Sequence, residues 1–149
     1  MESAPANRLI GAIIELDLAT KGETPMSSID EAETRRVMEH HIEAVRANDA
    51  NAINDDYAEN AICLGAFGPV IGKQAIRDYE ARLGDHFEGT TLHWTRIQYS
   101  DDMVYFEWIA QKADMGITVE GAVTMIIRDG KIVKKAEKFI WHEPNLKLV

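Results

Sequence analysis

The sequence predicts an α+β fold. Apolar residues recur at helical spacing through the first half of the chain and at a spacing of two through the second half. Helices that come first, followed by strands joined by short turns, favour an antiparallel meander with the helices covering one face of a curved sheet. The chain has 149 residues, of which 46% are hydrophobic, so it fits one domain with one core.

The predicted helices have recognisable starts and ends. Ser28 and Glu31 match the capping box, in which a serine hydroxyl and a glutamate carboxylate satisfy free amides at a helix start. Asn48 and Asp49 end this first helix, and Gly72 leads into the last one. We expect about three helices, at residues 28–47, 50–57 and 73–83.

Strand patterns dominate the second half of the chain. Short turns rich in Asp, Gly and Ser separate runs in which apolar and polar residues alternate. Earlier in the chain, residues 61–66 form a short apolar run that is typical of one more strand, and Gly68 and Pro69 are expected to form a loop. Four long strands are predicted at residues 90–99, 103–112, 117–128 and 131–142.

Residues 1–26 precede this domain as an appendage, and the domain itself is expected to span residues 27–149. The apolar stretch from Leu9 to Leu18 is interrupted by Glu15 and Asp17, and no basic cluster precedes it. It therefore fits neither a signal peptide nor a membrane span. An extra helix or strand that packs on the domain or on a neighbouring subunit is the expected structure.

Charge and cysteine content exclude several kinds of partner. The formal net charge is −9 at pH 7, with no block of basic residues, so the chain would repel both a phosphate backbone and an anionic bilayer. We expect no nucleic-acid partner and no membrane partner. The single cysteine, Cys63, cannot form an internal disulfide or a multi-thiolate zinc site, which fits a reducing, cytoplasmic location.

A histidine interrupts the apolar stripe of the first long helix. His41 shares its helical face with Val37 and Val45, so the side that is buried must carry His41 inward, while His40 points about 100° away. Two interpretations have even weight. His41 is either a core histidine that is hydrogen-bonded to a neighbour or a group that works in a pocket.

The face on which Glu137 lies depends on one hairpin turn, at Asp129 and Gly130. A two-residue loop pairs Arg128 with Lys131 and places Glu137 on the outer face of the sheet. A three-residue loop with a bulged glycine changes the pairing by one residue and places Glu137 inside, because a slip of one residue inverts the face.

The neighbours of Glu137 on its strand favour the inner face. Val133, Phe139 and Trp141 alternate with Glu137 and are apolar. Lys135 follows the same alternation and must then point inward too, which argues against this geometry unless Lys135 pairs with Glu137 or reaches the rim. The alternative is a solvated strand residue, since carboxylates are seldom buried.

Other chemical motifs fail on inspection. The stretch from Gly68 to Gln74 lacks one spacer residue of a phosphate-binding loop and has Gln74 in place of the hydroxyl that binds magnesium. His40 and His41 are adjacent, whereas helical zinc sites place their histidines four residues apart. We therefore expect no metal and no cofactor.

Three stretches occur in a specific order, HIEAVRAND at 41–49, DYAENA at 56–61 and IGKQAI at 71–76, with RDGKIV closing the pattern at 128–133. In this order they resemble the nuclear transport factor 2-like superfamily and, more narrowly, its SnoaL-like and ketosteroid-isomerase-like branch. The resemblance covers residues 28–142 and implies a cone-shaped fold, in which a strongly curved, mostly antiparallel sheet wraps around a long N-terminal helix and encloses a pocket. It also implies a homodimer through the outer sheet face, where Tyr105, Ile109 and Ile126 offer an apolar patch.

The resemblance also places residues around this pocket. Alternation along residues 103–112 independently puts Phe106 and Trp108 on the apolar side of their strand, with Tyr105 and Glu107 facing outward. His93 lies on a strand of ambiguous register and could line the pocket or face out. The pocket wall implied by the resemblance consists of His41, Tyr57, Tyr79, Phe106, Trp108 and Phe139.

Ketosteroid isomerase chemistry does not carry over to this chain. Matched to the family pattern, the helix tyrosine of that enzyme falls at His41, its carboxylate base at Gly65 and its strand aspartic acid near Val123. Without the base and the acid, isomerisation of Δ5-ketosteroids is not expected. SnoaL-like cyclases instead place a catalytic aspartate a few residues after the Asp-Gly turn, and that position matches Glu137.

These observations lead to one expected function and one alternative. The expected function is a cofactor-independent acid/base enzyme (an isomerase, cyclase or dehydratase) for a small hydrophobic carbonyl compound. Glu137 would be the base, His41 its partner or acid, and Tyr57 a donor to the developing oxyanion. Tyr79, His93, Phe106, Trp108 and Phe139 would contact the ligand. The alternative is a non-catalytic ligand-binding or dimerisation module that kept the fold without the chemistry.

Overall fold

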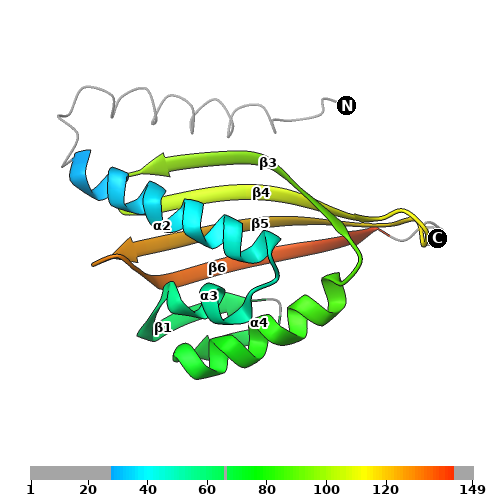
Figure 1. The fold of residues 1–149 in the computed structure, drawn as a ribbon, viewed down its shortest axis with the longest axis horizontal. Coiled ribbons are helices and arrows are strands. Elements are labelled where there is room, and N and C mark those ends of the chain that lie inside the picture. The colour runs from blue at the N-terminus through cyan, green and yellow to red at the C-terminus, as the bar shows by residue number, and fades with distance from the viewer. Residues whose placement is uncertain (1–27, 66, 143–149) are drawn as a thin grey trace, which may run out of the picture.

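The computed structural model describes residues 28–65 and 67–142, which form three helices and one six-stranded sheet (Figure 1). This arrangement confirms the predicted α+β class. None of the helices in this part of the chain is long and apolar enough to cross a membrane. The predicted appendage, residues 1–26, lies outside the described residues. In chain order the elements are α2 (Ser28–Arg46), α3 (Ala50–Asp55), β1 (Tyr57–Gly65), β2 (Gly68–Ile71), α4 (Lys73–Phe87), β3 (Thr91–Ser100), β4 (Met103–Lys112), β5 (Ile117–Arg128) and β6 (Lys131–His142).

The helices follow the prediction except at the ends of α3 and α4, since α3 ends at Asp55 rather than at residue 57. Helix α2 begins at Ser28, whose side chain is outside the described part, and ends within a residue of its expected end. Asp49 caps α3 by accepting hydrogen bonds from the backbone amides of Asn51 and Ala52. The predicted end of α4 at residue 83 was wrong, because the helix continues through Gly84 to Phe87. A single glycine costs a helix only about 1 kcal/mol, which burial of Leu83 on the same helix can offset.

The strands form one sheet in the order β2-β1-β6-β5-β4-β3. Neighbouring strands are antiparallel except β1 and β6, which run parallel. The four long strands lie within a residue of their predicted bounds. Two details of the prediction were wrong: β1 starts at Tyr57 rather than at residue 61, and Gly68 and Pro69 belong to β2 rather than to a loop.

Helices α2 and α4 cover the inner face of the sheet, and the core lies between them and the sheet (Figure 1). On α2, Val37, His41 and Ala44 are buried, whereas His40 is exposed, as the helical periodicity predicts. On β4, Phe106 and Trp108 are buried, and Tyr105 and Glu107 lie on the outer face, where the Tyr105 hydroxyl donates to Glu107. The inner face therefore collects apolar side chains from almost every strand.

The hairpin between β5 and β6 determines where Glu137 points. Its turn is the two-residue type: Arg128 pairs with Lys131, and Asp129 and Gly130 both have positive φ. The expected three-residue loop was therefore wrong. The register nevertheless changes by one residue further along, because Val133 is an extra residue in β6, and Glu137 consequently pairs with Val123 on the inner face.

The outer face of the sheet has no helix over it within the described part of the chain. Tyr105, Ile109 and Ile126 on this face are half-buried rather than fully exposed. A homodimer through this face stays a prediction.

Candidate functional site

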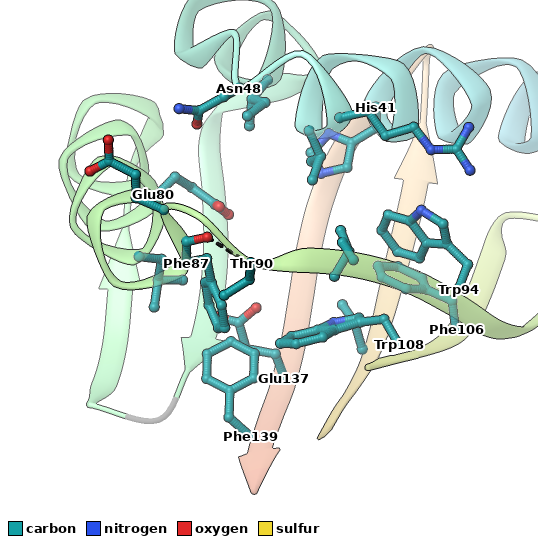
Figure 2. A pocket seen from close by; sticks show the side chains of 18 of the residues that line it. His41, Asn48, Glu80, Phe87, Thr90, Trp94, Phe106, Trp108, Glu137 and Phe139 are labelled. Atoms are coloured by element: carbon teal, nitrogen blue, oxygen red, sulfur yellow. Dashed lines mark hydrogen bonds between the residues drawn. The ribbon is translucent and has the colours of Figure 1, made fainter. Parts of the chain in front are cut away.

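A cavity of about 530 Å³ opens between α2, α4 and the inner face of the sheet. This volume suits a small organic ligand. Exposed residues at the ends of α2 and α4 form its rim, among them Arg46, Asn48 and Glu88. Figure 2 shows His41 on one side of the cavity and Glu137 and Trp108 on the other. Its aromatic wall consists of Phe87, Trp94, Phe106, Trp108 and Phe139.

The aromatic wall is held by ring contacts in edge-to-face and tilted geometries. Phe87 packs edge-on against Trp108, with ring centroids 5.3 Å apart, and Trp108 lies 5.4 Å from Phe139. The indole of Trp108 lies across Gly121 of β5, where a Cβ would be only 2.6 Å from the indole Nε1. A glycine at position 121 is therefore what allows this tryptophan to lie flat against the sheet.

A lysine between two glutamates forms the charged wall of the cavity. We call Lys135, Glu80, Glu137, Tyr57 and Tyr79 the lysine cluster. Lys135 Nζ lies 2.7 Å from Glu80 Oε1 and 2.8 Å from Glu137 Oε2. The three charged side chains are nearly buried, with exposures of 6% for Lys135, 17% for Glu80 and 2% for Glu137. All three still line the cavity.

Two tyrosines form hydrogen bonds with the two glutamates of this cluster. The Tyr57 hydroxyl donates a hydrogen bond of 2.9 Å to Glu80 Oε1, and the Tyr79 hydroxyl donates to Glu137 Oε1. Burial, together with the charge of Glu80, raises the pKa of Tyr57 well above its usual value. Burial and the hydrogen bond to Glu137 likewise raise the pKa of Tyr79. Both hydroxyls therefore stay protonated and fix the carboxylates in place.

Inside the cluster, charge pairing and hydrogen bonding together shift the pKa values of Glu80 and Lys135 more than burial does. Burial alone would raise the pKa of Glu80, but the charge of Lys135 and its hydrogen bond lower it overall. Burial would lower the pKa of Lys135, whereas Glu80 and the other neighbours raise it well above its usual value. Lys135 is therefore an ammonium. One ammonium faces two carboxylates, so the cluster has one negative charge in excess.

The opposite wall carries a second polar group. We call His41, Asp56 and His40 the histidine cluster. His41 Nδ1 lies 3.1 Å from Asp56 Oδ2, and His40 Nδ1 lies 2.8 Å from Asp56 Oδ1. His41 and Asp56 are buried, whereas the His40 side chain is 55% exposed. An ionised carboxylate only accepts hydrogen bonds, so each imidazole donates from Nδ1, and in the neutral form of His41 the lone pair is then on Nε2.

The cavity brings together five of the eight residues predicted for the site: His41, Phe106, Trp108, Glu137 and Phe139. Tyr57 and Tyr79 lie behind the wall and touch the glutamates instead. The expected donation from Tyr57 to a substrate oxyanion is thus not what the geometry provides. His93 is exposed and outside the cavity, because it pairs with Ile109 on the outer face, and its neighbours Leu92 and Trp94 line the cavity.

Sequence reasoning missed Glu80 and Asp56. Glu80 lies four residues after Ile76 on the buried face of α4, and this spacing could have indicated an inward carboxylate. Lys135 was recognised as an inward lysine that needs a partner, and its pairing with Glu137 meets that condition. Within residues 28–65 and 67–142, no group of three or more His, Cys, Asp or Glu side chains is arranged to hold a metal ion.

The curved sheet and its helices have the cone-shaped fold of solved NTF2-like structures. Residues 38–135 match the SnoaL-like domain, and the chain belongs to this family. The search of curated proteins by sequence finds no match. The SnoaL-like resemblance inferred from the motifs is confirmed.

Solved structures share this fold at low sequence identity. An NTF2-like protein of unknown function from Mesorhizobium loti is 20% identical, with a TM-score of 0.66, and the match covers 79% of this chain and 99% of that one. An NTF-2 like protein of unknown function from Burkholderia xenovorans LB400 is 22% identical, with a TM-score of 0.64 over 79% and 92% of the two chains. An LEH-like epoxide hydrolase of M. tuberculosis is 15% identical, with a TM-score of 0.59 over 74% and 84%. At least one solved structure with this fold is thus named as an enzyme.

Proposed function

We propose that the chain is a cofactor-independent acid/base enzyme that acts on a small hydrophobic carbonyl compound, with Glu137 as the base. One observation carries this proposal: the Glu137 side chain is 2% exposed, yet it lines an aromatic cavity large enough for such a ligand. A carboxylate that lines such a cavity can take a proton directly from a bound substrate. One fold can host several activities, so the site rather than the fold supports the assignment.

The lysine cluster supplies the groups that enolisation requires. Glu137 would take the proton from the carbon next to the carbonyl, and the electron pair would move to the carbonyl oxygen. Lys135, which lines the same cavity, would stabilise the negative charge that develops there. Glu137 would then return the proton to another carbon in an isomerisation. Tyr79 holds Glu137 in place, whereas Tyr57 acts through Glu80.

His41 would be the second proton carrier of this site. It lines the cavity and rests on Asp56, which keeps Nδ1 protonated and leaves Nε2 as the basic nitrogen. In a dehydration or cyclisation, where a proton leaves one atom and another atom receives one, two carriers on different walls are needed. His41 and Glu137 come from α2 and β6, respectively.

Exchange of substrate protons for deuterium tests the proposal without knowledge of the product. Small aromatic and alicyclic ketones are incubated with the protein in D2O, and deuteration next to the carbonyl is followed by NMR. We expect the wild-type protein to accelerate exchange of at least one ketone. Glu137→Gln should slow that exchange by roughly 10²- to 10⁴-fold, because the general base is lost, while ligand affinity changes little. The control is Glu120→Gln, an exposed carboxylate on the neighbouring strand β5.

Unchanged exchange in Glu137→Gln would reject the role of Glu137. The competing function is a binding module without turnover. It is favoured by one observation: Lys135 and Tyr79 already engage the two oxygens of Glu137, as in a purely structural ion pair. In that case no ketone exchanges faster with the wild-type protein than in buffer, although ligands still bind in the cavity.

A further inference from the structure

The buried polar atoms around the cavity differ in whether they already have a hydrogen-bond partner within the protein. Within the lysine cluster, each tyrosine hydroxyl donates to a glutamate, and the lysine ammonium bonds to both glutamates. These groups satisfy one another without a ligand. His41 differs, since only its Nδ1 has a hydrogen-bond partner, Asp56.

His41 lines the cavity, and its Nε2 is the nitrogen that Asp56 does not engage. No other residue in the described part of the chain forms a hydrogen bond with Nε2. Nor is Nε2 sealed in the core, because Trp94 Nε1 is the only partnerless side-chain nitrogen or oxygen in that part that lies out of reach of solvent. Figure 2 shows the His41 ring projecting from α2 toward the space above Trp108. The side chain is 4% exposed, so Nε2 is a nearly buried atom without a hydrogen-bond partner in the described part of the chain.

Asp56 fixes the character of that nitrogen. Its carboxylate accepts one hydrogen bond from His41 and one from the exposed His40. With the donated proton on Nδ1, the neutral imidazole presents a lone pair at Nε2. A bound ligand shields this acceptor from water, and the shielding makes binding less favourable unless the ligand donates a hydrogen bond to Nε2.

The charges of the cavity further restrict the class of ligand that can bind. The glutamates exceed the lysine by one negative charge, which disfavours a carboxylate or phosphate ligand. Five aromatic side chains line the wall and favour a flat apolar body. We infer that the cavity recognises a hydroxylated aromatic compound, whose neutral hydroxyl donates a hydrogen bond to Nε2 of His41. This inference deepens the proposed function and rests on it for placing the substrate in this cavity.

A matched pair of probes tests the inference. 2-Naphthol carries the hydroxyl, and 2-methoxynaphthalene keeps the same ring and oxygen but cannot donate. Binding to the full chain is measured by isothermal titration calorimetry. The wild-type protein should bind 2-naphthol roughly 5- to 10-fold more tightly than the ether, as expected for one buried hydrogen bond. The same preference should persist in His93→Leu, which changes an exposed histidine outside the cavity.

His41→Leu should bring the two affinities to within about 2-fold of each other, because the acceptor is gone. A long-range ¹H–¹⁵N NMR spectrum of the wild-type protein gives a second test that needs no variant, and it should show the proton of His41 on Nδ1. Equal affinities in the wild-type protein, no binding of either probe, a preference that survives in His41→Leu, or a proton on Nε2 would each overturn the inference. Failure of the deuterium exchange alone would instead reject catalysis and leave this recognition intact.

Discussion

The two polar clusters of the cavity are built in opposite ways. The lysine cluster joins β6 to α4 and β1, and its charges and hydroxyls are paired with one another. The histidine cluster joins α2 to the segment before β1, and it leaves one nitrogen of His41 without a partner. The hydrogen bonds of the lysine cluster are therefore formed before a ligand binds, whereas the histidine cluster gains its last hydrogen bond from the ligand.

This difference separates two tasks of a small enzyme site. A base must be held in one position, which requires supporting hydrogen bonds and a counter-ion that together fix a side chain such as Glu137. A recognition group must instead stay unsatisfied until the ligand binds, because only then does binding gain the hydrogen bond. If the comparison is right, changes at Lys135 or Glu80 will cost mainly stability, and changes at His41 mainly ligand preference.

The largest effect is expected when Lys135 is replaced by methionine. Lys135→Met keeps the length of the side chain but leaves two buried carboxylates without their cation. Removing one partner of a buried ion pair costs about 3–5 kcal/mol, so the free energy of unfolding in urea at pH 7 should fall by that amount. The deficit should narrow toward acid pH, where protonation of the glutamates relieves their repulsion.

The matched control for this variant is Lys134→Met. Lys134 is the preceding residue of β6, and it is exposed on the other face. Its replacement should change the free energy of unfolding by at most about 0.5 kcal/mol. Equal losses in the two variants would show that the lysine cluster is not the rigid element that the comparison requires.

A smaller loss is expected when Gly65 becomes alanine. A Cβ at Gly65 would collide with the Tyr79 hydroxyl, lying 2.9 Å from its Cζ and 3.2 Å from Glu137 Oε1. The new methyl group must push the tyrosine away from the base, and overpacking of this kind costs about 1–3 kcal/mol. Urea denaturation of Gly65→Ala measures the cost.

Gly84→Ala provides the opposite expectation. Gly84 lies inside α4, and its Cβ would make an ordinary contact 3.5 Å from Asn48 Oδ1. Alanine favours the helix over glycine by about 0.5–1 kcal/mol, so this variant should be slightly more stable than the wild-type protein. If Gly65→Ala is as well tolerated as Gly84→Ala, the Tyr79 to Glu137 contact is looser than the structure indicates.

Most of the fold could be predicted from local patterns, because each long strand has its own alternation and its own turn. What failed depended on contacts between elements. The turn at Asp129 and Gly130 has the chemistry of a two-residue loop, and the change of face comes from a bulge at Val133 that no glycine marks. Glu137 therefore reaches the predicted face by a route that the sequence does not show.

The candidate site was less predictable than the fold. His41 and Glu137 could be chosen because each interrupts an apolar pattern on its own element, and both line the cavity. Their partners could not be chosen in the same way. Asp56 and Glu80 are separated from them along the chain by 15 and 57 positions, and only the packing of α2 and α4 on the sheet brings them near. Sequence spacing says little about such long-range pairs.

The smallest effect concerns the acid sensitivity that Glu80 contributes. Lys135 lowers the pKa of Glu80 in the folded protein below its value in the unfolded chain, which is about 4.3. A carboxyl group with a lowered folded pKa stabilises the fold above its unfolded pKa, and this stabilisation is lost as the pH falls through the folded pKa. Glu80→Gln removes the titration. The difference in unfolding free energy between the wild-type protein and Glu80→Gln should therefore shrink as the pH falls from 7 to 3.

Glu43→Gln, an exposed change on α2, serves as the reference for general acid effects and should follow the wild-type curve throughout. The test bears directly on the comparison of the two clusters. A self-satisfied cluster must lose stability when its carboxylate is neutralised, because Lys135 is then left with one charged partner in place of two. A difference that stays constant across this pH range would mean that the pairing of Glu80 with Lys135 does not stabilise the fold, and the lysine cluster would have to be regarded as open to ligands in the same way as His41.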